Sequence, residues 1–156
     1  MFASGDLAAV LGLTAKSLEA LSPIALIFRI ENGLPVKAVD KVAHLLAPDD
    51  ARFKYRLVPK ATLERRKTTN KLSPEEGTRL ARLARVWSAA RDVWGGDGEA
   101  RDFLFRPHPM AEDQRPVDLV IQSEFGAELI LDILAGLKYG TAARPPRSSL
   151  RRIPRS

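Results

Sequence analysis

Basic side chains crowd the segment between residues 52 and 71, which carries eight lysines and arginines but a single acidic residue, Glu64. Arg can form a paired hydrogen bond with guanine, and Lys neutralises phosphate as a point charge. This density of positive charge therefore predicts contact with nucleic acid. Pro59 is suited to the start of a helix, and the helix that follows carries the candidate DNA-binding residues Lys60, Thr62, Arg65, Arg66 and Lys67.

Residues suited to catalysis are sparse. His44 lies in a helical segment, and His108 stands between two prolines. The sequence contains no Ser-His-Asp spacing, no phosphate-binding glycine loop and no cluster of metal ligands. The glycines at 95, 96 and 98 follow a helical pattern and not a strand, so they indicate a helix stop. We therefore predict that the chain is not an enzyme and holds no metal or cofactor.

Composition narrows the class of protein further. The chain of 156 residues has no cysteine, which favours a reducing compartment. No apolar run approaches the roughly 20 residues of a membrane helix, and the first residues lack the features of a signal peptide. We expect a cytoplasmic protein without a membrane partner.

Charge is unevenly distributed along the chain. Residues 86–140 hold ten acidic residues against five basic ones, whereas residues 141–156 hold five arginines and no acidic residue. The chain thus combines a basic segment, an acidic domain and a basic tail that we expect to be flexible. Such segregation predicts two different partners, one of them polyanionic. The alternative is that these charges are simply solvated.

Hydrophobic spacing predicts helices almost everywhere and gives strands little support, so the fold class is all-α. The clearest helix start is Ser73-Pro74, where Glu76 completes a capping box. Other starts are expected at Ser22-Pro23 and at Pro116, and Asn32-Gly33 and Gly140 are expected to cap helix ends. The predicted helices span 4–20, 23–32, 35–47, 49–55, 59–69, 74–94 and 97–105, followed by one from 116 and one from about 125 to 140.

The three short helices at 35–47, 49–55 and 59–69 have the spacing of a helix-turn-helix, whose last helix enters the major groove of DNA. The turn before that helix usually contains a glycine or another residue that tolerates positive φ. Here it holds Arg56-Leu57-Val58. This turn favours general DNA affinity over specific operator recognition. A solvent-facing charged helix in a bundle is the alternative interpretation.

Three stretches together resemble the Xre/MbcA/ParS family of antitoxins. They are GLPVKAVDKVAHLL (33–46), ATLERRKTTNKLSPEEGTRLARLARV (61–86) and RPVDLVIQSEFGAELILDILAGLKYG (115–140). The resemblance implies N-terminal helices at 1–34, a helix-turn-helix at 35–72, a dimerisation and toxin-binding domain at 73–141 and a basic tail at 142–156. It departs from the family in the turn residue Leu57 and in the longer tail.

The resemblance also implies a function. Members of this family form homodimers, bind RES-domain toxins that consume NAD or use it for ADP-ribosylation, and repress their own operon. We expect inhibition by occlusion of the toxin's active site, with toxin-binding residues Arg115, Lys138, Tyr139, Gly140 and Thr141. Leu83, Trp87 and Trp94 are the expected dimer contacts, with core packing as the alternative role for the two tryptophans. An alternative function is a stand-alone helix-turn-helix transcriptional regulator with a C-terminal dimerisation domain.

Overall fold

The computed structural model describes residues 9–12 and 22–140, and within these residues the fold is all-α. A single isolated bridge between His108 and Gln114 is the one extended pairing found there. The predicted fold class is therefore confirmed. The tail at 142–156 and most of the helix expected at 4–20 lie outside the described residues.

The elements follow one another closely along the chain. They are α3 (Pro23–Asn32), α4 (Lys37–Leu46), α5 (Lys54–Leu57), α6 (Lys60–Arg66), α7 (Pro74–Trp94), α8 (Asp97–Phe105), the 3₁₀ turn η1 (Pro109–Ala111), α9 (Pro116–Gln122), α10 (Glu124–Ala135) and the π-helical turn η2 (Gly136–Gly140).

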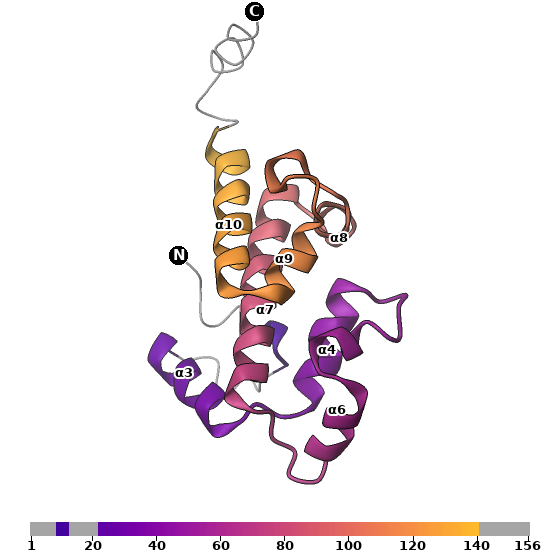
Figure 1. The fold of residues 1–156 in the computed structure, drawn as a ribbon. Helices are drawn as coiled ribbons and strands as arrows, with labels where there is room; N and C mark the ends of the chain where they lie inside the picture. The colour runs from indigo at the N-terminus through magenta and orange to yellow at the C-terminus, as the bar shows by residue number, and fades with distance from the viewer. Residues whose placement is uncertain (1–8, 13–21, 141–156) are drawn as a thin grey trace, which may run out of the picture.

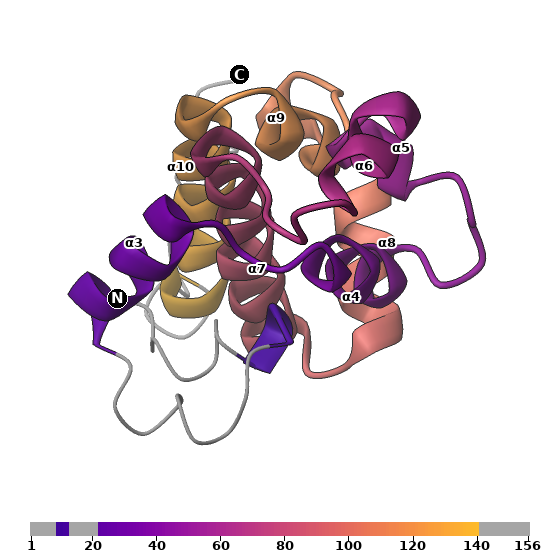
Figure 2. The same cartoon turned by 90° about the horizontal axis from the view of Figure 1, so that it is seen from below.

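The long helix α7 is the axis of the molecule (Figure 1). Its first half packs against α3, α4 and α5, and it also packs against α8, α9 and α10. Leu80, Leu83, Ala84, Trp87 and Ala90 of α7 are buried in this core. One amphipathic helix therefore joins two helical modules, and Figure 2 shows the first of them from below.

The predicted capping box fixes the start of α7. The Glu76 N–H donates to Ser73 Oγ at 3.2 Å, and the Ser73 N–H donates to Glu76 Oε1 at 2.8 Å. These two bonds satisfy backbone donors that a helix start otherwise leaves free. The prediction from sequence is confirmed, as are the bounds of α3, which begins at Pro23 and ends at Asn32, with Gly33 as its cap at φ of 103°.

Four predicted helices end or begin elsewhere. Helix α4 spans Lys37–Leu46 instead of 35–47. Residues 51–53 form turns, so α5 begins only at Lys54, and α6 ends at Arg66 instead of Thr69. The α-helical part of the last helix ends at Ala135, five residues before the expected cap at Gly140, and continues as a π-helical turn. Tertiary contacts override local propensity at such helix ends.

Gly126 allows the two helices of the C-terminal module to approach closely. A Cβ at this position would lie 2.0 Å from the carbonyl oxygen of Leu119. Only glycine fits such an approach of one backbone to another. The start of α10 is therefore locked against the end of α9.

Candidate DNA-binding and toxin-binding surfaces

The turn between α5 and α6 is made without a left-handed residue. Val58 is extended (φ −141°, ψ 122°), and Pro59 follows with φ −54° and ψ 148°. Leu57 is buried completely at the end of α5. The expectation that Leu57 replaces a required glycine is wrong, because the chain changes direction through extended residues and uses Leu57 as a core anchor.

Helix α6 is held by its inner face and by the loop after it. Leu63 is buried on the inner face. Beyond the helix, the Leu72 N–H donates to the Leu34 carbonyl at 2.9 Å, and Asn70 Oδ1 accepts from the Val36 N–H at 3.1 Å. Asn70 adopts φ of 54°, a left-handed conformation that Asn tolerates well. The outer face of α6 is thereby presented on a fixed support.

The outer face carries part of the predicted DNA-binding set. Lys60, Arg65 and Lys67 are exposed, and Thr62 is half-buried. Lys67 forms an exposed ion pair of 3.1 Å with Glu64, which is easily exchanged for another partner. Lys60 and Arg65 form no ion pair with any other described residue, so their charges are available to an anion.

Arg66 has a different position from its neighbours. Its Nε and Nη2 donate to the two carboxylate oxygens of Glu76 at 2.9 and 3.1 Å. Burial acts to raise the pKa of Glu76, but hydrogen bonds from Arg66 and Ser73 outweigh it, so this pKa lies below its ordinary value. The bidentate pair holds α6 against the start of α7. Contact of Arg66 with DNA would require Arg66 to leave this pair.

The predicted toxin-binding end lies beyond α10. Lys138 forms a close ion pair with Asp92 of α7, and the hydrogen bond to Asp92 raises the pKa of Lys138. The side chain of Tyr139 is 65% exposed. The pair is one contact between η2 and α7, and the tyrosine ring beside it faces solvent. Gly140 ends the described residues, and Thr141 lies outside them.

The structure shows no contact between Arg115 and the described residues of η2, and Arg115 has other partners. It donates from Nε and Nη2 to Asp118 at 2.9 Å each. Arg56 of α5 reaches the same carboxylate at 3.0 Å. The hydrogen bond from Arg115 lowers the pKa of Asp118 against the opposing effect of burial. Arg56 therefore connects α5 with α9 through Asp118, while Arg115 pairs with the same carboxylate within the first turn of α9.

Two of the three predicted dimer contacts are core residues. Leu83 and Trp87 retain 2% and 3% of their exposure and pack inside the chain. Neither can contact a second copy in this conformation, so the prediction is wrong for both, and the alternative role of core packing applies to Trp87. Trp94 is 42% exposed and lies 5.9 Å from Phe103 between ring centroids.

Arginines that the sequence analysis did not single out connect helices that are distant in the sequence, and Arg82 and Arg101 do so between the two modules. Arg79 donates to the Leu57 carbonyl at 2.6 Å, and Arg82 donates to the carbonyls of Val120 and Ile121 at 2.9 Å each. Arg101 of α8 donates to the Leu45 carbonyl at 2.8 Å. Each guanidinium satisfies carbonyls that a helix end leaves free. Arg79, Arg82 and Arg85 follow one another at three-residue spacing on α7. This spacing was the signal in the sequence that could have identified them.

The two histidines have structural or surface positions. His44 is exposed on α4, and His108 Nδ1 accepts a hydrogen bond of 3.2 Å from the Met110 N–H. Within residues 9–12 and 22–140 no three His, Asp or Glu residues are grouped as a metal site would require. Among the helices that the structure describes, none has the length and apolar character needed to cross a bilayer.

One long helix joins a helix-turn-helix unit to a second helical module. This architecture defines the class of the protein as a two-module helix-turn-helix protein. Sequence comparisons agree with this division. The model of the antitoxin Xre-like helix-turn-helix domain matches residues 25–85, and that of the antitoxin Xre/MbcA/ParS C-terminal toxin-binding domain matches residues 89–140.

A curated relative supports the same assignment. Antitoxin Xre of Yersinia enterocolitica (serotype O:8 / biotype 1B) is 32% identical over 127 residues, which cover 79% of this chain and 84% of that protein. The chain belongs to the Xre family of antitoxins. The family match to residue 85 assigns the first half of α7 to the helix-turn-helix domain.

Proposed function

We propose that this antitoxin neutralises a RES-domain toxin, one that consumes NAD or uses it for ADP-ribosylation, by covering the toxin's active site with the end of its last helix. The observation that carries the proposal is the exposed ring of Tyr139 on the turn η2, which the ion pair between Lys138 and Asp92 links to α7. A rigid aromatic side chain with a polar tip is a typical anchor of protein interfaces. Inhibition of this kind needs no catalysis and no cofactor from the antitoxin.

The acidic character of residues 86–140 supports the same partner assignment. Ten acidic residues against five basic ones give this module a negative field, which accelerates association with a basic surface. The family match of residues 89–140 to a toxin-binding domain favours this function over a stand-alone regulator.

Repression of its own operon is the second part of the proposal. Lys60 and Arg65 lie exposed on α6, where a helix-turn-helix contacts DNA, and Lys67 lies exposed directly after its end. Thr62 is within the same helix. The antitoxin would act in the cytoplasm as a homodimer within a hetero-oligomeric complex with its toxin. A twofold protein on DNA contacts two half-sites about one helical turn apart.

The test is protection of cells that express the RES-type protein encoded beside the antitoxin gene. We expect Tyr139→Ala to weaken protection and truncation after Leu137 to abolish it, because the first removes the anchor and the second the whole turn. Truncation after Thr141 is the matched control, since it removes the basic tail and keeps the turn.

Circular dichroism and co-purification complete this experiment. The truncated chain must keep the helical spectrum of the full chain before loss of protection is assigned to the missing contact. Full protection by a folded chain that ends at Leu137 would overturn occlusion by this segment. Failure of the wild-type chain to co-purify with the RES-type protein would overturn the partner itself.

A further inference from the structure

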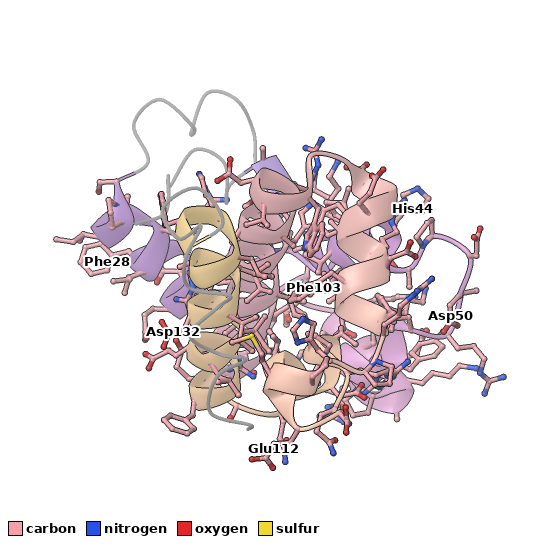
Figure 3. All side chains as sticks on the ribbon, turned by 90° about the horizontal axis from the view of Figure 1, so that it is seen from above. Phe28, His44, Asp50, Phe103, Glu112 and Asp132 are labelled. Carbon is pink, nitrogen blue, oxygen red and sulfur yellow. The ribbon has the colours of Figure 1, made fainter. Side chains whose placement is uncertain are left out.

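An open pocket of about 320 Å³ lies beside the C-terminal end of α7. Its wall includes Trp94 of α7, Phe103 of α8 and His108 of the following loop, and its charged lining is Glu99, Asp102 and Arg106. Figure 3 shows Phe103 between the helices of the C-terminal module. Its volume is at the lower end of the range for ligand pockets, so it can hold one long side chain and not a large cofactor.

Aromatic rings form the apolar part of the pocket. The rings of Trp94 and Phe103 lie 5.9 Å apart at an interplanar angle of 33°, and Phe103 meets the ring of His108 edge-on at 5.4 Å. Phe103 is buried, whereas Trp94 stays substantially exposed. The electron-rich faces of such rings attract cations, and Trp attracts them most strongly.

The carboxylates of the pocket differ from the other acidic groups nearby. Asp92 and Asp97 are both occupied by ion pairs with basic residues of this chain. Glu99 and Asp102, three residues apart on α8, are exposed and pair with no basic group among the described residues. With Arg106 included, the lining retains a net negative charge that nothing in the described chain neutralises.

We propose that this pocket receives an arginine side chain of the toxin. A guanidinium group can stack on the ring of Trp94 and donate hydrogen bonds to Glu99 and Asp102 at the same time. An ammonium group lacks the planar face, which is why arginine suits this lining better than lysine. The inference rests on the proposed function, because it names one contact within the toxin interface. It also gives Trp94 a role other than the predicted dimer contact.

Position supports a shared interface. Asp92, which pairs with Lys138 of η2, is two residues from Trp94 on α7. Residues two positions apart point to nearly opposite sides of a helix, so η2 and the pocket lie at the same end of α7 but on different sides of it. A partner that covers the end of the helix would contact both, and the desolvation it brings would strengthen the attraction between guanidinium and carboxylate.

The first experiment measures affinity for the purified toxin by calorimetry. We expect Glu99→Gln with Asp102→Asn to raise Kd about tenfold or more, as loss of a charged contact at an interface does. Glu31→Gln with Asp49→Asn is the matched control, because it removes two exposed carboxylates outside the C-terminal module. An unchanged Kd for the pocket variant overturns the proposal. Tighter binding also overturns it and points to an acidic group held by Arg106.

The second experiment separates this inference from the proposed function. Titration of the free antitoxin with ethylguanidinium should shift the indole N–H resonance of Trp94 saturably and leave that of the buried Trp87 in place, with sodium acetate as the control. If the wild-type chain does not bind the toxin, the proposed function fails and this titration alone decides whether the pocket takes a guanidinium. Equal shifts with ethylguanidinium and acetate overturn the pocket.

The third measurement addresses the competing role of Trp94. We expect Trp94→Leu to weaken toxin binding about threefold to tenfold, since stacking is lost while the apolar wall remains. The molar mass of the free antitoxin, measured by light scattering, should not change. A fall in mass would assign Trp94 to a contact between two copies and overturn its role in the pocket.

Discussion

Arg65 on α6 and Arg82 on α7 are the same residue type in different surroundings. Arg65 is exposed and forms no ion pair with the described residues, whereas Arg82 is half-buried and donates to two backbone carbonyls. Burial is the main effect that lowers the pKa of Arg82. The comparison teaches that a count of positive charges does not locate a DNA-binding surface. The partners of each guanidinium must be known.

The largest effect should come from replacing Arg82, the more buried of the two arginines. We expect Arg82→Met to lower the free energy of unfolding by about 3 kcal/mol, because the carbonyls of Val120 and Ile121 lose a charged donor. Urea denaturation measures it. Arg65→Met is the control and should change stability by less than about 0.5 kcal/mol. Similar losses of stability in both variants would contradict the difference that we infer between Arg65 and Arg82.

DNA binding, unlike stability, should depend on the exposed residues of α6. We expect Lys60→Gln with Arg65→Gln to weaken operator binding about tenfold and to lower the slope of log K against log salt by up to about 2, one ion for each lost phosphate contact. Fluorescence anisotropy at several salt concentrations measures both quantities. Arg106→Gln, which removes an exposed arginine in the other module, is the control and should leave the slope unchanged.

Glu76 allows a smaller and pH-dependent test. The folded-state pKa of Glu76 is lowered, so its stabilisation is present above its ordinary pKa of 4.5 and is lost as pH falls through the folded-state value. We expect Glu76→Gln to cost about 1 kcal/mol at pH 7 and to make stability less dependent on pH below about 4.5. Thermal unfolding between pH 3 and 7 checks this prediction.

Glu75→Gln is the matched control for that test. Glu75 is exposed in the same first turn of α7 and forms no ion pair among the described residues. We expect its replacement to leave the acid limb of the stability curve close to that of the wild-type chain. An equally flattened curve for this variant would assign the effect to the general charge of the helix start and not to the pair of Glu76 with Arg66.

Much of the architecture was predictable because it depends on neighbours in sequence. The capping box at Ser73, the stop at Gly33 and the apolar stripe of α7 involve residues within a few positions of one another. Helix ends without such local determinants were placed less well. The start of α5 and the change from α-helix to π-helix after Ala135 depend on packing.

The sequence predicted which residue types the candidate sites contain. It did not predict which of these side chains pair with other residues of the chain. Lys60 and Arg65 emerge on the outer face of α6 as expected, yet Arg66 in the same run of sequence is paired with Glu76. Arg115 was expected at a partner surface and lies in a network with Asp118 and Arg56. No spacing rule predicts which of several adjacent arginines meets a carboxylate from a later helix.

The sequence by itself determined the helical class, the caps that delimit the main helices and the separation of basic from acidic segments, because these follow from local backbone chemistry and composition. Only the tertiary structure decided that Leu83 and Trp87 belong to the core, that Leu57 anchors the turn and that α7 arginines satisfy carbonyls of distant helices. It also left Glu99 and Asp102 beside Trp94 without an ion pair to any residue that the structure describes. The physical reason is that burial and pairing are set by residues far apart in the chain, so they exist only once the helices have packed.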